Sequence, residues 1–504
     1  GYNTALGGDA LYSNTTANYN TAVGYQALTA NTTAGGNTAV GNQAMQNTTT
    51  AGGSVAMGYT AMLNNTTGGS LTGLGYEALL ANTTGSSNTA VGRAALRSNT
   101  TASDNTAVGK DALYANTTGT QNTALGKGAL ATITTASTNT AVGYNALTAN
   151  TSGSTNVAVG REAMQANTTG TENVAVGGGA LDANTVGNYN VAIGTGAVGV
   201  DTKGSRSIGI GYGALEQQNF TSATDAYNIG IGHQAGEENT NGERNVFIGG
   251  LAGSSATTAD DCVIIGYEAG GGATLTGHDN TYVGKRSGRY TTSGASNTAI
   301  GDQAGQALTT GGFNTLLGSD AGQNLTSGSN CIFLGKDAGL SGSPGGNHTT
   351  GSNDLVLGDE NIGAASIQVD WTVASDARDK TDFTALDLGL DFVKALAPVT
   401  YKWDKRSKYG DKYADDYDLN AQTPDGTHKE DWLDIGFKAQ EVEALEIAAG
   451  YNKSNKTNLT TSLTGDGKQY GIQYSKFVPI LVKAIQEQNA LIEALTARVA
   501  TLEG

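Results

Sequence analysis

The sequence predicts a mainly β fold: a trimeric parallel β-roll, or β-solenoid, of 17-residue coils, followed by a small α/β domain and a C-terminal coiled-coil helix. Three observations predict it: a 17-residue unit recurs through most of the chain, the composition changes after Gly358, and heptads occupy the C-terminal end. The expected domains are the repeats (1–358), a connecting strand segment (359–374), the α/β domain (375–475) and the helix (476–504).

The repeated unit reads Asn-Thr-Ala-Val-Gly-x-x-Ala-Leu, followed by Asn-Thr-Thr and a short variable stretch. Its glycine recurs 21 times from Gly7 to Gly358, and every step from Gly7 to Gly211 is 17 residues. The small and β-branched residues before the glycine suit a short strand buried on both faces, and the glycine permits a sharp corner. One coil cannot bury its own apolar face. We therefore expect the coils to stack about 4.8 Å apart into a rod of roughly 100 Å.

The asparagine four residues before the repeat glycine predicts a ladder of side-chain amides, each bonding the next. Cys262 and Cys331 replace this asparagine in two coils. Those coils are too far apart for a disulfide, whose Cα atoms must lie within about 7 Å, so we expect two buried thiols. A thin coil also has little core, so we expect three chains to bury a further apolar face together.

The unit, for example residues 139–147, resembles the head repeat of trimeric autotransporter adhesins. The resemblance implies a left-handed parallel β-roll over residues 1–358. The unit differs in length, because 17 residues is longer than the usual adhesin unit. The chain begins with glycine inside a repeat, so we expect a longer parent protein.

Composition limits the partners and cofactors. The net charge of −17 argues against nucleic acid as a partner, because nucleic-acid binding needs clustered Lys and Arg. The chain contains no run of 18 apolar residues, so we expect no membrane insertion. The histidines are scattered and no metal-ligand cluster is evident, so we expect no cofactor. Asp415, Asp416 and Asp418 suggest calcium, but EF-hand spacing is missing and a solvated loop is the favoured interpretation.

Four sequence blocks follow the repeats: Ser375–Lys380, Gly389–Trp403, Asp434–Leu445 and Tyr470–Ile485. In this order they resemble the intramolecular chaperone domain of phage endosialidases and tail fibres, a peptidase-like family. In that family the domain trimerises, guides folding of the fibre ahead of it and then cuts itself off. The resemblance maps the family's serine to Ser375 and its lysine to Lys380.

The chemistry of this pair is reasonable without the family. A serine hydroxyl becomes a good nucleophile when a base takes its proton, and a lysine can be that base where burial lowers its pKa. The cut should lie beside Ser375: the hydroxyl most easily reaches the carbonyl of Ala374, whereas the resemblance points to the Ser375–Asp376 bond. Asp376 and Arg378 also match the family motif, and an ion pair that shapes the turn is their favoured role.

The C-terminal tail carries a heptad pattern typical of a coiled coil. Its a positions are Val478, Ile485, Ile492 and Val499, and its d positions are Leu481, Gln488, Leu495 and Leu502. β-branched a residues with leucine at d favour a dimer, but the rest of the chain favours a trimer.

These observations favour a phage tail fibre shaft, located in the virion and extracellular when mature, that forms a homotrimer and binds other tail proteins. Its host partner would be a cell-surface receptor, with a glycan as one candidate. Its only expected chemistry is one cut on itself. The alternatives are a bacterial trimeric surface adhesin and a polysaccharide-depolymerising tailspike.

Two features of the repeats bear on these alternatives. Asp320 and Asp337 are the best carboxylate pair for a glycosidase, but exposed turn residues are the simpler interpretation. Residues 212–228 and 336–353 break the 17-residue step and are either receptor contacts or harmless insertions. Their notable residues are Phe220, Tyr227, Pro344 and His348.

Overall fold

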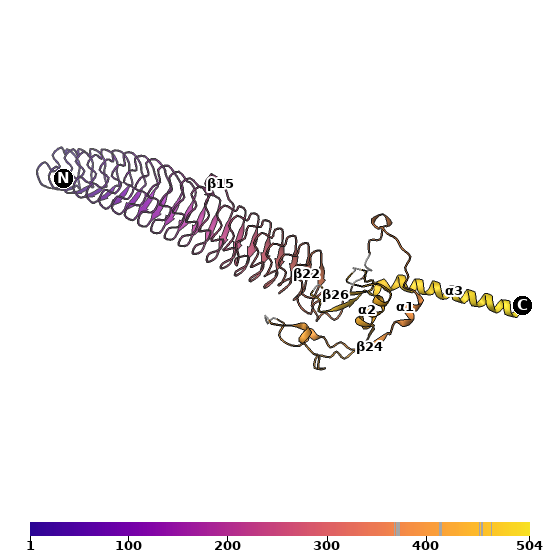
Figure 1. The fold of residues 1–504 in the computed structure, drawn as a ribbon. Coiled ribbons are helices and arrows are strands. Elements are labelled where there is room, and N and C mark those ends of the chain that lie inside the picture. The colour runs from indigo at the N-terminus through magenta and orange to yellow at the C-terminus, as the bar shows by residue number, and fades with distance from the viewer. Residues whose placement is uncertain (367, 369–372, 413–415, 453, 455–456, 465) are drawn as a thin grey trace. The chain divides into compact units, whose positions relative to one another are not determined.

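The computed structural model describes residues 1–366, 368, 373–412, 416–452, 454, 457–464 and 466–504. The chain divides into two compact units, Gly1–Phe313 and Asn314–Gly504. Figure 1 shows the parallel stacked coils with one short strand in each, which confirms the predicted β-solenoid of 17-residue coils. The small C-terminal domain and the long C-terminal helix are also present.

In the first unit, each repeat contributes one three-residue strand to a parallel sheet. The strands are β1 (Thr4–Leu6), β2 (Thr21–Val23), β3 (Thr38–Val40), β4 (Val55–Met57), β5 (Thr72–Leu74), β6 (Thr89–Val91), β7 (Thr106–Val108), β8 (Thr123–Leu125), β9 (Thr140–Val142), β10 (Val157–Val159), β11 (Val174–Val176), β12 (Val191–Ile193), β14 (Ile208–Ile210), β16 (Ile229–Ile231), β17 (Val246–Ile248), β18 (Val263–Ile265), β19 (Thr281–Val283) and β20 (Thr298–Ile300). A second small sheet pairs β13 (Gly204–Ser205) with β15 (Thr224–Asp225).

The strands pair in register, so equivalent repeat positions lie side by side: Thr21 pairs with Thr38 and Ala22 with Ala39. Within a single chain, only one of the two strand faces is buried. The central alanine is fully buried, whereas its two neighbours, such as Thr21 and Val23, are only half-buried. Side chains alternate along a strand, so in this thin coil the central residue points into the core and its neighbours point outward.

The repeat glycine is required by the close approach of the next coil. Gly24 has φ +133°, and a Cβ built on it would lie 2.4 Å from the carbonyl oxygen of Gly41. The same geometry recurs at successive coils, for example at Gly41 against Gly58. Any side chain at this position would therefore collide with backbone and would also hold a strained conformation.

The predicted asparagine ladder is present. Amide-to-amide bonds occur in several coils, for example from Nδ2 of Asn156 to Oδ1 of Asn139 at 3.2 Å, and backbone groups add further bonds. The backbone N–H of Asn37 donates to Oδ1 of Asn20 at 2.9 Å, and Nδ2 of Asn37 donates to the carbonyl of Ala51 at 2.8 Å. The asparagine of Asn-Thr-Thr forms a second ladder with the expected amide-to-amide bonds: Nδ2 of Asn99 donates to Oδ1 of Asn82 at 2.7 Å. Most coils thus satisfy buried polar groups through a neighbour, whereas Oδ1 of Asn31, Asn116 and Asn239 is buried without a hydrogen-bond partner.

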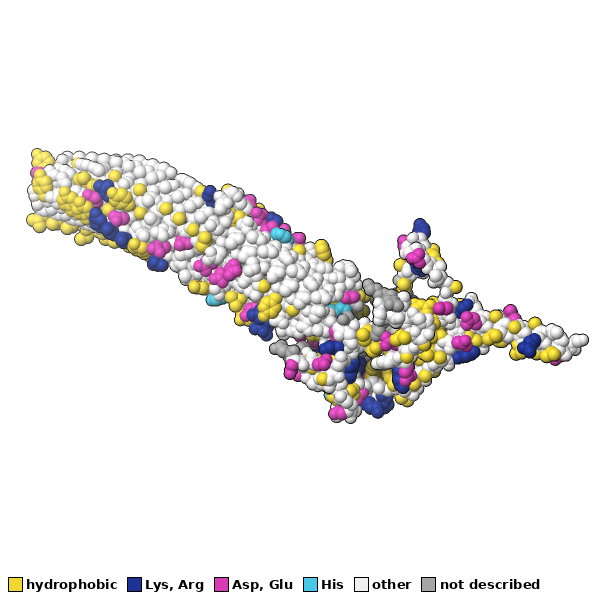
Figure 2. Space-filling view, viewed as in Figure 1, with side chains coloured by type: hydrophobic (Ala, Val, Ile, Leu, Met, Phe, Trp, Pro, Cys, Tyr) yellow, Lys and Arg dark blue, Asp and Glu magenta, His cyan; other side chains and the backbone are white. Residues whose placement is uncertain are grey.

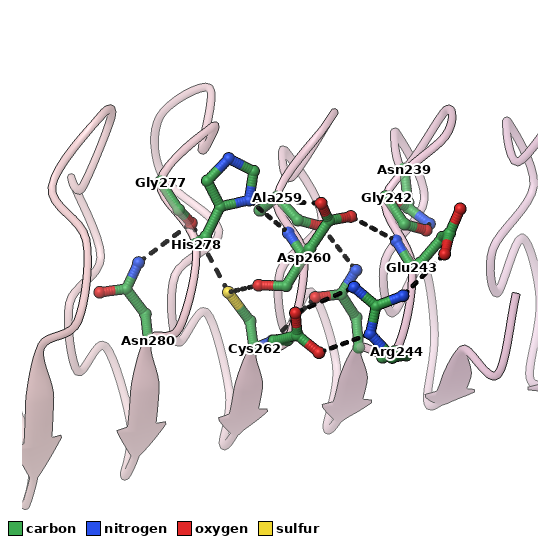
Figure 3. Close-up of polar contacts among 12 residues, drawn as sticks. Asn239, Gly242, Glu243, Arg244, Ala259, Asp260, Cys262, Gly277, His278 and Asn280 are labelled. Carbon is green, nitrogen blue, oxygen red and sulfur yellow. Dashed lines mark hydrogen bonds and ion pairs between the residues drawn. The ribbon is translucent and has the colours of Figure 1, made fainter.

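The cysteines occupy the first ladder, as predicted, and both are buried and free. The backbone N–H of Cys262 donates to Oδ1 of Asn245 at 3.0 Å, and Sγ lies 3.3 Å from the carbonyl oxygen of Asp260. Figure 3 shows Cys262 directed toward Asp260 and Gly277. Burial raises the pKa of this thiol to about 11, so Cys262 acts as a small core residue.

The core changes its composition along the stack. Up to Leu215, the residue four after the repeat glycine is usually leucine or methionine, and the central strand residue is alanine or glycine. From Gly236 to Gly339 the first position is glycine, and a larger residue such as Phe247 fills the centre of most of these strands, the exceptions being Gly230 and Ala299. A Cβ on Gly253 would lie 2.2 Å from Cδ1 of Phe247. One position is therefore small where the other is large, which keeps the core filled.

The second unit begins with three more coil strands, β21 (Thr315–Leu317), β22 (Ile332–Leu334) and β23 (Leu355–Leu357). Its other elements are η1 (Ala377–Asp379), α1 (Leu390–Ala395), β24 (Val399–Tyr401), η2 (Arg406–Lys408), η3 (Leu419–Ala421), β25 (Asp434–Gly436), α2 (Ala439–Ala448), β26 (Thr461–Leu463), β27 (Tyr470–Ile472), η5 (Tyr474–Lys476) and α3 (Phe477–Glu503). β24 pairs with β25 and β26 with β27, both antiparallel. The strand predicted from Ile367 to Val373 lies largely outside the described residues.

A small core joins the helices of the second unit. It contains Leu388, Phe392, Val442, Phe477 and Ile480. α1 ends shortly before Pro398 and β24 follows it, as the sequence predicts. At the start of α1, the backbone N–H of Leu390 donates to Oε2 of Glu487 at 2.6 Å, so α3 also supplies a carboxylate to that terminus.

Candidate self-cleavage site and chaperone module

The predicted site residues lie on one exposed turn around η1. Asp376 caps η1, because its Oδ1 accepts a hydrogen bond from the backbone N–H of Arg378 at 2.9 Å. This turn brings Nζ of Lys380 to 2.6 Å from Oγ of Ser375. Nζ also lies 3.5 Å from the carbonyl oxygen of Ser375, which belongs to the Ser375–Asp376 bond. Ala374 is exposed next to this pair.

An ion pair fixes the shape of the same turn. Nη2 of Arg378 lies 2.6 Å from Oδ2 of Asp376. The Arg378 guanidinium lowers the pKa of Asp376 below its ordinary value, chiefly through side-chain hydrogen bonds. Because the carboxylate stays ionised, it can accept the backbone bond that closes η1. Asp376 and Arg378 therefore contact each other, while Ser375 and Lys380 form a separate pair.

The long helix α3 presents two apolar faces. Phe477, Ile480 and Ala484 are buried in the core of the module. The a and d residues lie on another face and are exposed: Ile485 by 64% and Leu495 by 64%. Beside the start of α3 is an apolar groove of about 360 Å³, lined by Val393, Leu396, Pro398, Phe437, Tyr474, Phe477 and Leu481. The d residue Leu481 thus belongs to both the heptad face and the groove.

The carboxylates considered for glycosidase chemistry are not exposed turn residues, and that expectation is wrong. Asp320 is 7% exposed and Asp337 is 1% exposed. Oδ2 of Asp337 lies 2.7 Å from Nζ of Lys412, which also lies 2.9 Å from Oε1 of Glu360. Asp337 is therefore part of a buried ion cluster between the last coils and the module.

This cluster holds its lysine in the charged form. Burial alone would lower the pKa of Lys412, but its hydrogen bonds to Asp337 and Glu360 outweigh burial and raise the pKa. Nζ of Lys405 also donates to the carbonyl of Glu360 at 2.6 Å, and the backbone N–H of Asn347 donates to Oδ2 of Asp466 at 3.1 Å. No sequence pattern indicates these contacts, because their partners are far apart in the chain.

The other candidate residues have local structural roles. Asp418 pairs with Lys468 at 2.9 Å and caps η3, and Asp415 lies outside the described residues. Within the described part of the chain, no group of three or more metal-binding side chains is placed to hold an ion. Phe220 is buried and His348 packs against Phe333, so neither is an open receptor contact. Tyr227 and Pro344 are exposed; they are the residues of these segments still open to a partner.

Stacked parallel coils, a small α/β module and a long helix with an exposed heptad face define a β-solenoid protein with a small C-terminal domain. Residues 375–451 match the family model described as chaperone of endosialidase, and the match begins at Ser375. The match and the stacked coils are consistent with a tail fibre that carries a chaperone domain. Searches of curated proteins and of solved structures each found no match to the chain. Among the described residues, no helix is both long and apolar enough to cross a membrane.

Proposed function

We propose that this chain forms the shaft of a homotrimeric phage tail fibre used for host attachment, and that its C-terminal module drives assembly and then cuts itself off. The 2.6 Å contact between Nζ of Lys380 and Oγ of Ser375, at the start of the chaperone match, is the observation that carries the proposal. It joins the two residue types needed for serine–lysine chemistry.

Two unpaired apolar faces support a trimer. The outward strand positions carry no charged residue in any of the 21 repeats, and in β4 they are the half-exposed Val55 and Met57. The a and d face of α3 is also exposed. Apolar faces of this length are normally covered by a partner, and a heptad face is covered by equivalent helices. Three copies of the chain would bury both faces at once.

The proposed role of the module as a folding aid rests on two features: the two apolar faces of α3 and the ion cluster of Lys412. One face of α3 belongs to the module core, through Phe477 and Ile480, while the heptad face is left for other chains. The ion cluster of Lys412 connects the same module to the last coils. Trimerisation of α3 would therefore bring three last coils together, on which further coils add by stacking.

The self-cleavage would proceed through an ester. Ser375 and Lys380 are exposed in the single chain, so the pair would act once other chains of the trimer cover it. Nζ of Lys380 then accepts the hydroxyl proton of Ser375, and Oγ attacks a carbonyl carbon. The C–N bond of that peptide then breaks, and the leaving nitrogen takes the proton from Lys380. Water finally hydrolyses the ester, which restores the serine hydroxyl and leaves a new carboxylate.

We propose that the bond cut is Ser375–Asp376, because Nζ of Lys380 lies near its carbonyl oxygen. A serine that attacked its own carbonyl would form a strained four-membered ring. The attacking Oγ for this bond would therefore come from another chain of the trimer. Cleavage of the Ala374–Ser375 bond requires no second chain, so the new N-terminal residue distinguishes the two routes.

The test is expression of wild type, Ser375→Ala and Lys380→Met, followed by denaturing gels and intact-mass measurement. We expect wild type alone to release a C-terminal fragment of about a quarter of the 51.0 kDa chain, beginning at Asp376. Ser475→Ala is the matched control, since Ser475 is another exposed serine of the module, and it should cleave like wild type. An intact wild-type chain, or a cleaved Ser375→Ala chain, would reject the dyad.

A further inference from the structure

One edge of the coil stack carries a continuous row of aromatic and cationic side chains. The row occupies the position directly after the repeat glycine in seven successive coils, and we name it the Tyr/Arg/Lys strip. Its aromatic members are Tyr59, Tyr76 and Tyr144, and its cationic members are Arg93, Lys110, Lys127 and Arg161. All seven are exposed. Figure 2 shows Lys and Arg gathered in a row beside hydrophobic side chains on this part of the stack.

The distribution of charge makes the strip unusual. Residues 1–200 contain five Lys and Arg residues, and four of them lie in the strip. The fifth, Arg97, lies next to it, with its Nε 2.6 Å from Oε2 of Glu77. In a chain with a net charge of −17, this grouping concentrates nearly all the positive charge of the first 200 residues along one edge.

The fold does not need these residues. The same coil position is Asn42 just before the strip and Gly178 just after it, and the coils there have the same strands and core. The strip side chains instead contact one another across coils. The rings of Tyr59 and Tyr76 stack with centroids 5.5 Å apart, and Nζ of Lys127 lies 5.2 Å from the Tyr144 ring centre.

The strip is also compatible with trimer formation. The outward strand positions, which we assign to contacts between chains, are uncharged throughout, whereas the strip holds four cations. Burying unpaired charges in an interface is costly. The strip therefore remains in water when the strand faces associate, and each trimer presents three copies of it.

From these observations we infer that the strip is a binding site for an acidic polysaccharide that lies along the shaft, an inference that rests on the host-attachment function proposed above. Tyrosine rings offer flat apolar faces with a polar end, which suits sugar rings, and Arg and Lys bind carboxylates. Seven coils span about 30 Å at the strand spacing, so several sugar units would be bound by one chain.

Acidic side chains beside the strip favour a polysaccharide over single-stranded nucleic acid. Asp111 lies 3.8 Å from Lys110, and Glu162 lies 3.0 Å from Arg161. Such carboxylates accept hydrogen bonds from the free hydroxyls that every sugar of a polysaccharide carries and that the backbone of single-stranded DNA lacks. Nucleic-acid grooves combine aromatic residues with a dominant positive charge, and the strip lacks that excess.

The experiment compares two matched double variants of the full-length protein. Lys127→Gln with Tyr144→Ala removes a cation and an aromatic ring from adjacent coils of the strip. Tyr267→Ala with Lys285→Gln removes the same two residue types from the same coil position, in two adjacent coils outside the strip. Binding to alginate oligosaccharides, neutral dextran and single-stranded DNA is measured at one fixed salt concentration.

We expect wild type to bind alginate more tightly than dextran or DNA. The strip variant should bind it at least about tenfold more weakly, a change of about 1.4 kcal/mol, whereas the control variant should match wild type. Equal binding of dextran, tighter binding of DNA, absent alginate binding, or equal losses in both variants would each overturn the inference. Oligomeric state and cleavage are measured on the same samples. If both are normal, such a failure rejects the strip alone; a monomeric, uncut wild type rejects the proposed function.

Discussion

The coil stack and the C-terminal module are stabilised in different ways. In the coils, neighbouring repeats bond chiefly through backbone groups and uncharged amides, as Asn37 does with Asn20, and a few ion pairs such as Arg97 with Glu77 are added. In the module, a small apolar core is supplemented by ion pairs and carboxylate contacts, such as those of Lys412. The coils gain stability from neighbours of the same kind, whereas the module has a core of its own.

This difference has a consequence for assembly. A coil without neighbours buries little, so a growing stack is unstable until several coils are in place. The module has a core of its own around Phe392 and Phe477, so we propose that it folds before any coil is complete and that α3 then offers its heptad face to two other chains of the proposed trimer. We therefore infer that assembly begins at the C-terminus of the chain.

The largest effect is expected from charges on the heptad face of α3. Ile485 and Ile492 are 64% and 53% exposed, so Ile485→Asp with Ile492→Asp leaves the module core intact. Two carboxylates per chain at a positions would be buried together in a trimer, which is prohibitively costly. We expect loss of the trimer and aggregated or unfolded coils, measured by light scattering after size exclusion.

The matched control places the same charges on the outer side of α3. Ala490→Asp with Ala497→Asp uses two exposed positions seven residues apart, outside the a and d rows. This variant should remain trimeric and soluble. A soluble, folded shaft from the Ile485 and Ile492 variant would show that the coils assemble without the helix, and would contradict the comparison.

An intermediate effect is expected from the core of the coils. Phe247→Ala removes a fully buried ring and should cost about 3–5 kcal/mol. Gly253→Leu should also destabilise, because its Cβ would collide with Phe247. The double variant recreates the leucine-type core of the earlier coils, so the two losses should be less than additive. Local opening free energies from hydrogen exchange measure this coupling.

A natural substitution provides the control for the core. Leu147→Met introduces the residue that other coils carry at this position, such as Met45 and Met164, both fully buried. Its cost should be under about 1.5 kcal/mol. Strictly additive losses for Phe247→Ala and Gly253→Leu would show that the two positions do not share one space.

Much of the coil stack is predictable from the sequence because equivalent residues make the same contacts in successive coils. The register, the ladder position and the unpaired thiols of Cys262 and Cys331 all follow from counting residues. The sequence pattern does not separate the two strand faces, because a three-residue strand with one face buried by its own chain looks like one buried on both sides. Whether the side chains of Thr21 and Val23 face the core or the outside depends on how the coil closes in space, which the residue pattern does not specify.

The module is less predictable because its contacts are unique. The five-residue separation of Ser375 and Lys380 predicted that they could meet on a turn, and they lie 2.6 Å apart; their catalytic role stays a prediction. By contrast, Asp337 and Lys412 meet over a long sequence separation with no repeat to indicate it. Asp337 therefore looked like an exposed turn residue although it is buried.

The smallest effect is expected from acid, which should act on the module contacts and spare the coils. Burial alone would raise the pKa of Asp466, but hydrogen bonds from Thr464 and from the backbone of Asn347 and Lys468 lower it. A carboxylate with a lowered pKa stabilises the fold above its unfolded value of about 3.9, and this contribution is lost as pH falls through the folded value.

Hydrogen exchange at pH 5 and pH 3, corrected for intrinsic rates, should therefore show the segment at Asn347 losing protection in acid. The coil amides around Asn139, held by groups that do not titrate in this range, should keep theirs. Asp466→Asn removes the titrating group and should abolish the pH dependence at Asn347, while lowering its protection at both pH values. Equal losses in both segments would mean that the coils, too, depend on carboxylates, and the contrast between amide-bonded coils and a charge-bonded module would fail.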